Sequence, residues 1–264
     1  MRLLILLLTF AAFGNISEQP LANGTITKIT LQSPQLNAER GIYIYLPHNY
    51  YSSNKKYPVI YMHDAQNLFD DETAFAGEWR VDETLDSLKA QVIVVGIMHG
   101  NETRLKELTP YPNPEYGGGE ADNYVDFLVH TVKPYVDTTY RVKTGRRHTY
   151  IFGSSLGGLL SYYALIKYPE VFAGAGIFSP SFWFTDDIYR LTENTKKMDA
   201  KLYFMAGDSE SEQMVSDVER MIKLLKRKVN GKNIKLKIIP GGKHNEALWS
   251  KQFAEAYLWL IQGG

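Results

Sequence analysis

Eight short runs of apolar and β-branched residues recur along the chain, and segments with helical spacing separate the later ones. The runs occupy residues 25–32, 41–46, 57–62, 91–98, 148–152, 174–178, 202–205 and 234–239. Runs of this length, bounded by turn residues, predict β-strands. The first two alternate apolar and polar positions, which is typical of antiparallel strands. Later runs are continuously apolar, which is typical of parallel strands covered on both faces. The pattern predicts an α/β fold with a mostly parallel eight-stranded sheet and antiparallel N-terminal strands.

Two segments near the C-terminus have the apolar spacing of surface helices. One stripe contains Met214, Val218, Met221, Ile222 and Leu225, and the other contains Phe253, Ala256, Tyr257, Leu260 and Ile261. Spacings of three and four residues place each set on one helix face. The longest expected loop is residues 103–120, with three prolines and three consecutive glycines. A loop of that length inside a compact domain is usually functional or mobile.

The N-terminus has the pattern of an export signal. Arg2 is followed by an apolar run that reaches Phe13, too short to span a bilayer as a mature helix. Ala12 and Gly14 are small residues at the positions that a cut after Gly14 requires. We expect a signal peptide at residues 1–14, a single catalytic domain at 15–264, and a periplasmic or extracellular protein. The alternative is an uncleaved membrane anchor.

Composition restricts the partners and the chemistry. The chain has 264 residues, of which 44% are hydrophobic, enough for one large core. Its 29 basic and 29 acidic residues cancel without a long block of one sign, so neither nucleic acid nor an anionic membrane surface is an expected partner. A small-molecule or glycan substrate fits better. The chain has no cysteine, which excludes disulfides and a thiol nucleophile, and no histidine pair has zinc-ligand spacing. We expect no metal and no cofactor.

The sequence Gly153-Ser154-Ser155-Leu156-Gly157 carries the candidate chemistry. A G-x-S-x-G pattern arises by chance in about one chain in ten of this size at average composition. Here a strand-like run enters it and a helix-like run leaves it, as a nucleophile elbow requires. The glycines make room for a strained turn that exposes the serine hydroxyl. The pattern predicts Ser155 as nucleophile and the N–H of Leu156 as an oxyanion donor.

A serine nucleophile needs a histidine base, and a carboxylate must orient that histidine. Of the histidines, His244 follows the motif at a distance, in a loop after the last predicted strand. In this type of fold the order is serine, acid, histidine. The loop after the strand at 202–205 offers Asp208 and Glu210, and position alone does not decide between them. His63 and His99 end strands at the same sheet edge and are candidate substrate contacts.

Aromatic residues follow the strand after the nucleophile. Phe182 and Trp183 should stand at the catalytic edge of the sheet, where they would pack on a phenolic acyl group or a sugar, or simply form a hydrophobic wall. The chain has no long insertion between Ala173 and Lys201. We therefore expect no large helical lid and an open cleft suited to bulky esters.

Several stretches together resemble a known family. They are residues 43–47, 57–64, 66–69, 140–141, 153–158, 179–181 and 241–244. In these stretches the chain resembles the esterase family of the α/β-hydrolase superfamily that includes esterase D, feruloyl and acetyl xylan esterases, enterochelin-type siderophore esterases and the antigen 85 acyltransferases. The resemblance to the feruloyl and siderophore branch is closest, through residues 107–110 and 181–183.

The resemblance implies an α/β-hydrolase fold with helices on both faces of the sheet, and a serine esterase that acts through an acyl-enzyme on a carbohydrate-linked or siderophore-type ester. It implies Glu210 as the acid, with Asp208 in reserve, and the backbone N–H of Gln66, next to Ala65, as second oxyanion donor. Some relatives use a Ser–His dyad. The alternatives are acyl transfer of the antigen 85 type and a non-catalytic binding protein on the same fold.

Overall fold

The computed structural model describes residues 17–20, 24–75 and 77–263 of the chain. The expected signal peptide at residues 1–14 lies outside these ranges. Within them, every helix is too short or too polar to cross a bilayer.

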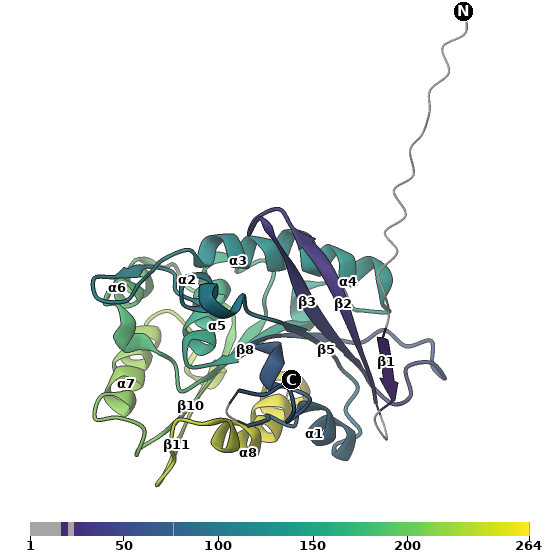
Figure 1. The fold of residues 1–264 in the computed structure, drawn as a ribbon. Coiled ribbons are helices and arrows are strands. Elements are labelled where there is room, and N and C mark those ends of the chain that lie inside the picture. The colour runs from purple at the N-terminus through teal and green to yellow at the C-terminus, as the bar shows by residue number, and fades with distance from the viewer. Residues whose placement is uncertain (1–16, 21–23, 76, 264) are drawn as a thin grey trace, which may run out of the picture.

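Nine strands form the main sheet, in the order β1-β2-β3-β5-β4-β8-β9-β10-β11 (Figure 1). Their bounds are β1 Ser17–Pro20, β2 Thr25–Ser33, β3 Ala38–Leu46, β4 Val59–His63, β5 Ile93–Ile97, β8 Thr149–Ser154, β9 Gly174–Phe178, β10 Lys201–Gly207 and β11 Ile234–Ile239. The pairs from β1 to β5 through β2 and β3 are antiparallel. The pairs from β5 to β11 are parallel.

All eight predicted strands are present, and β1 is an addition at the edge. Its four residues carry no apolar pattern, so the sequence periodicity did not predict this strand. It pairs with β2 through the backbone, Ser17 opposite Lys28 and Pro20 opposite Thr25.

The helices lie in the segments between strands. They are α1 Val81–Ser87, α2 Arg104–Leu108, α3 Ala121–Phe127, α4 Lys133–Thr139, α5 Leu156–Lys167, α6 Asp187–Asn194, α7 Met214–Leu225 and α8 Glu246–Tyr257. Five-residue π-helical turns follow α3 at Leu128–Val132 and α8 at Leu258–Gln262, and single 3₁₀ turns lie at Ala65–Asn67, Asn101–Thr103, Arg146–His148, Phe182–Phe184 and Gly231–Asn233. Both helices predicted near the C-terminus are confirmed as α7 and α8.

The segment expected to be one long loop, residues 103–120, is instead ordered into elements. It holds the short helix α2 and a small hairpin of β6 Pro112–Asn113 and β7 Gly117–Gly118. Gly117 and Gly118 have φ of 75° and 89°, a region open mainly to glycine, which lets the chain reverse there. The prediction of a long loop was wrong because a five-residue helix is too short to show a periodicity.

Helices cover both faces of the sheet. In β4, Tyr61 packs into a core with α3, α4, α5 and α7, whereas Ile60 and Met62 pack into a second core with α1 and α8. Figure 1 shows α1 and α8 on one side of the sheet and α3, α4 and α5 on the other. Since successive side chains point to opposite faces, a strand between two cores must be apolar throughout. The parallel strands end at one edge of the sheet, so their loops converge there.

Candidate active site

Ser155 lies in a strained turn between β8 and α5. Its backbone has φ 57° and ψ −123°, which non-glycine residues rarely adopt. A Cβ at Gly153 would lie 2.5 Å from the carbonyl carbon of Gly157, so only glycine allows the strand and helix to approach this closely. The N–H of Ser155 donates to the carbonyl oxygen of Phe178 at 2.9 Å, which ties the turn to β9. Strain of this kind persists only where surrounding contacts enforce it, and it is concentrated at functional sites.

His244 is paired with Glu210. Nδ1 of His244 lies 2.6 Å from Oε2 of Glu210, whose side chain is only 1% exposed. The other oxygen, Oε1, accepts hydrogen bonds from the N–H of Gly207 at 2.5 Å and from Oγ of Ser179 at 2.7 Å. Asp208 points elsewhere, since its Oδ1 accepts from the N–H of Gly241 at 2.7 Å. The structure therefore brings Glu210, rather than Asp208, to the histidine.

Ser155 and His244 face the same cleft of about 740 Å³. Oγ of Ser155 lies 3.3 Å from Oγ of Ser181, and among the described contacts no hydrogen bond joins Ser155 to His244. Hydrogen bonds of this kind are often long without substrate and shorten in the reacting complex. The cleft is lined by Asp64, Gln66, Asn67, Thr73, Ala74, Phe75, His99, Asn101, Arg104, Ser154, Ser155, His244, Glu246 and Trp249.

The turn after β4 is held by an ion pair. Asp64 has φ 56°, and its two carboxylate oxygens accept from Nε and Nη2 of Arg104 at 2.7 and 2.8 Å. Burial opposes ionisation, but the Arg104 guanidinium holds the pKa of Asp64 below its ordinary value. The side chain of the next-but-one residue, Gln66, exchanges two hydrogen bonds with the backbone of His99, at 3.2 and 3.4 Å. These contacts fix the backbone of Gln66 beside the cleft.

A second buried ion pair supports the wall that carries Arg104. Arg40 on β3 pairs with Glu107 on α2, and both side chains are almost fully buried. Glu107 also accepts from the N–H of Gly100 at 3.1 Å and from Oγ1 of Thr103 at 2.5 Å. The loop after β5 is thereby closed on itself, which places His99 and Arg104 at the cleft.

The loop after the turn at residues 65–67 forms another part of the cleft wall and is closed by short contacts. Oγ1 of Thr73 donates to the carbonyl oxygen of Gln66 at 2.8 Å, and the N–H of Phe75 donates to Oδ1 of Asn67 at 3.1 Å. The N–H of Trp79 donates to the carbonyl oxygen of Asn67 at 2.8 Å. Phe75 itself is 94% exposed and lines the cleft. An exposed aromatic side chain at a cleft is a candidate substrate contact.

Two of the expected substrate contacts are placed in the core instead. His63 is 2% exposed and packs beneath the elbow, where a Cβ at Gly153 would lie 2.9 Å from its ring. Burial lowers the pKa of His63 to about 4, so the ring is neutral at pH 7. Phe182 is fully buried against Tyr162 and Phe204. The structure therefore places neither His63 nor Phe182 on the surface of the cleft.

Trp183, the third expected contact, is on the surface. It is 53% exposed and packs edge-on against Tyr116, with ring centroids 6.0 Å apart. It is not among the residues that line the cleft, although it lies two positions after Ser181, the hydroxyl neighbour of Ser155. His99, the reserve candidate, does line the cleft.

Three residues that line the cleft, Phe75, Arg104 and Asp64, were not predicted as site residues from the sequence. Phe75 had one usable signal, an aromatic residue in a polar loop that follows a strand ending at the catalytic edge. Arg104 and Asp64 are 40 positions apart in the sequence, and no spacing rule connects them.

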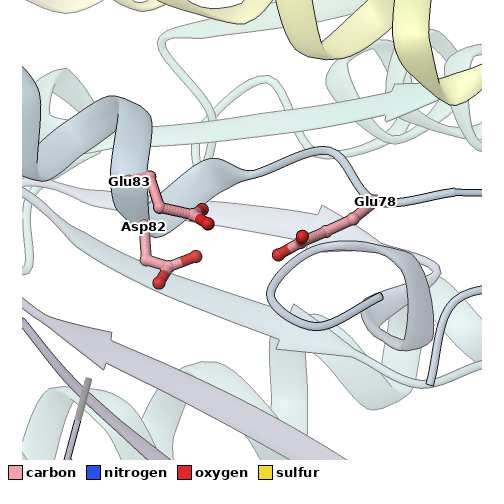
Figure 2. Close-up of side chains that lie close together, drawn as sticks. All are labelled: Glu78, Asp82 and Glu83. Atoms are coloured by element: carbon pink, nitrogen blue, oxygen red, sulfur yellow. The ribbon is translucent and has the colours of Figure 1, made fainter. Parts of the chain in front are cut away.

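Three acidic side chains gather at the start of helix α1. Figure 2 shows Glu78, from the loop before α1, facing Asp82 and Glu83 from the first turn of that helix. Oxygens of the three lie within 4.8 Å of one another, a set of ligands that suits a hard cation such as Ca²⁺. Arg80 balances one charge, since its Nη2 lies 3.4 Å from Oε1 of Glu83. Burial and the Glu83 carboxylate raise the pKa of Asp82 to about 8 and that of Glu78 to about 7.

Replacing Asp82 with asparagine is expected to stabilise the protein at alkaline pH. Between the ordinary carboxyl pKa of about 4 and the raised values, the folded chain holds more protons than the unfolded chain, so stability falls as pH rises. Asp82→Asn removes one of the ionisations responsible. We expect Asp82→Asn to raise the unfolding midpoint at pH 9 by about 2–4 °C, which corresponds to about 1 kcal/mol of unfolding free energy. We expect little change at pH 4.

Thermal unfolding in EDTA at both pH values measures this effect. The exposed neighbour provides a control, because Glu83→Gln should give a smaller gain with the same pH dependence. An Asp82→Asn protein that is less stable than the unmodified protein at pH 9 would contradict the expectation that ionised Asp82 destabilises the fold.

Comparisons with known proteins give the site a context. The sequence model of a family described as "Putative esterase" matches residues 33–260. The "Uncharacterized protein YbbA" of Bacillus subtilis is 26% identical over 82% of this chain and 90% of its own. The "Ferri-bacillibactin esterase BesA" of the same bacterium is 28% identical over 60% of this chain and 61% of its own. The solved structure of a ferulic acid esterase has a TM-score of 0.68 and 16% identity over 91% of this chain and 98% of that one, a likeness of fold.

Proposed function

Since this chain belongs to the "Putative esterase" family and is a carboxylic ester hydrolase of the α/β-hydrolase fold, we propose that Ser155, His244 and Glu210 carry its reaction. The observation on which the proposal rests is the pairing of His244 with the buried Glu210 in the same cleft as Ser155. The carboxylate accepts a hydrogen bond from the Nδ1–H of His244, which leaves Nε2 of the imidazole as an acceptor for the serine proton.

The reaction proceeds through an acyl-enzyme. Oγ of Ser155 attacks the ester carbonyl carbon as His244 removes its proton, and His244 then gives that proton to the departing alkoxide. Water, deprotonated by His244, attacks the acyl-serine, and the carboxylic acid is released as His244 returns that proton to Oγ of Ser155. Leu156 is the first residue of α5, so its N–H has no partner within the helix. That N–H and the N–H of Gln66 stabilise the oxyanion.

The charges of the cleft favour a neutral ester. Among its lining residues the permanent cation is Arg104, which Asp64 already neutralises, and Glu246 adds a carboxylate. A ferric tris-catecholate has a net charge of −3, because three dianionic ligands surround a trivalent ion, and this surface would repel it. As the substrate we therefore favour a carbohydrate-linked acyl ester, of feruloyl or acetyl type, over a siderophore ester. The exposed Phe75 offers a face for an aromatic acyl group.

A substrate comparison tests this order. One purified sample is assayed with a feruloylated oligosaccharide, an acetylated oligosaccharide and a ferric catecholate trilactone, and products are separated by chromatography. We expect kcat/KM for one of the sugar esters to exceed that for the trilactone by about 100-fold, and free acid to be the product. A preference for the trilactone would reverse the assignment. Transfer of the acyl group to an added sugar would mark the enzyme as an acyltransferase.

The N-terminal pattern at residues 1–14 supports export of the enzyme. N-terminal sequencing of the protein recovered outside the cytoplasm should begin at Asn15 or a few residues later. Recovery of the full-length chain from the membrane fraction would instead indicate an uncleaved anchor.

A further inference from the structure

Trp249 touches the active-site histidine directly. It lies on α8, whose N-cap, Asn245, follows His244 immediately. The Trp249 and His244 rings are 5.0 Å apart between centroids and nearly perpendicular, at 88°. Such edge-to-face contact restricts the rotation of the imidazole about its side-chain bonds. The indole therefore stands where it can set the orientation of the base.

The same indole also reaches the acid, through Ser179. Nε1 of Trp249 donates to Oγ of Ser179 at 2.8 Å, and Oγ of Ser179 donates to Oε1 of Glu210 at 2.7 Å. The other oxygen of Glu210 lies 2.6 Å from Nδ1 of His244. The contacts thus form a closed ring of four side chains, from α8 and from the loops after β9, β10 and β11. One residue, Trp249, contacts the base and holds the partner of the acid.

The indole N–H determines the direction of the hydrogen bonds among these four side chains. An indole N–H can only donate, whereas a serine hydroxyl has one proton and two acceptor positions. Because Trp249 occupies an acceptor position of Ser179, the hydroxyl proton is free to point at Glu210. Ser179 is fully buried, so water does not compete for that proton. Oε1 of Glu210 is thereby occupied, and Oε2 is left for His244.

The indole is itself held in place. Trp249 is almost fully buried, and its ring lies 5.9 Å from that of Trp79, which stacks on Phe178 at 5.3 Å. Side chains packed in this way keep one rotamer. We propose that Trp249 is a positioning residue that fixes the geometry of the His244–Glu210 pair through Ser179. This inference rests on the proposed function of that pair.

The test separates loss of the N–H from loss of packing. Trp249→Phe keeps an aromatic ring beside His244 and removes the donor. We expect kcat on p-nitrophenyl acetate to fall about tenfold, the typical effect of one hydrogen bond, with KM changed less than twofold. When the Ser179 hydroxyl is no longer held toward Oε1, the N–H of Gly207 is the one described donor left on that oxygen, and the charge of Glu210 acts more strongly on His244. The acid limb of the pH profile of kcat/KM should therefore shift to higher pH.

Two further variants make the result specific. Ser179→Ala should reproduce both effects, and the double variant should be no worse than Ser179→Ala alone, because both changes break one chain of contacts. Trp259→Phe is the matched control, since it trims an indole that packs on Tyr203, with ring centroids 6.0 Å apart, and that has no described contact with Trp249 or Ser179. It should lower the unfolding midpoint without moving the pH profile. If Trp249→Phe does not fold, Ser179→Ala alone decides the question by the same readouts.

Fluorophosphonate labelling of the unmodified enzyme and of Ser155→Ala comes first. Absence of labelling at Ser155 would refute the proposed function. If labelling occurs but Trp249→Phe or Ser179→Ala keeps kcat within twofold and an unchanged pH profile, the positioning role is refuted while the function stands. An equal shift in Trp259→Phe would also refute it.

Discussion

Replacing Ser155 with alanine is expected to lower kcat on p-nitrophenyl esters by about 10⁴- to 10⁶-fold, the range found when a serine nucleophile is removed. The covalent step needs the hydroxyl, and neither Ser154 nor Ser181 occupies the strained position at φ 57°. Alanine meets the same backbone strain as serine, so the fold and its unfolding midpoint should be nearly unchanged. The residual rate reflects binding and oxyanion stabilisation.

Steady-state kinetics together with a burst titration measure this loss. Ser161→Ala is a suitable control, because it removes a serine hydroxyl from α5, the helix that follows Ser155, where that hydroxyl donates to the carbonyl oxygen of Gly157 at 2.8 Å. It should retain most of the activity. An active Ser155→Ala protein, with more than a tenth of the normal kcat, would exclude Ser155 as the nucleophile.

Replacing Glu210 with glutamine is expected to lower kcat by about 10²- to 10⁴-fold. Glutamine has the same shape but no charge, and its amide favours the wrong tautomer of His244, in which the Nε2 proton blocks acceptance from Ser155. The charge that stabilises the imidazolium in the transition state is lost as well. The effect should appear in kcat rather than KM, because the carboxylate is buried beneath the histidine and does not reach substrate.

Asp208→Asn is the matched control for this substitution. Asp208 is two residues away on the same turn, and its carboxylate accepts from the N–H of Gly241 rather than from His244. We expect kcat within about threefold of normal, the effect of a change outside the reacting geometry. Equal losses in both variants would show that the loop after β10 acts through its conformation. No loss in Glu210→Gln would indicate a Ser–His dyad.

Much of the fold was predictable from the sequence because its signals are local. The continuous apolar runs of β5 and β8 follow from burial on both faces, and the elbow follows from glycines that flank a serine between a strand and a helix. The edge strand β1 and the hairpin of β6 and β7 were not predictable, because backbone pairing creates them without an apolar pattern.

Within the site, the sequence located the loops but not the directions of their side chains. Asp208 and Glu210 belong to one turn, and contacts with Ser179 and Gly207 decide which reaches His244. Phe182 and Trp183 are neighbours in a single 3₁₀ turn, yet one is buried and the other exposed. Directions of this kind depend on tertiary packing, which no spacing rule encodes.

The cleft wall that carries Phe75 is closed at its base by Asn67, which accepts hydrogen bonds from the backbone of Phe75 and of Trp79. A loop whose ends are joined in this way can be exchanged without disturbing the sheet that carries Ser155. Gene duplication followed by substitution at Ala74 and Phe75 would therefore let descendants of this enzyme acquire new acyl preferences while they inherit the chemistry intact.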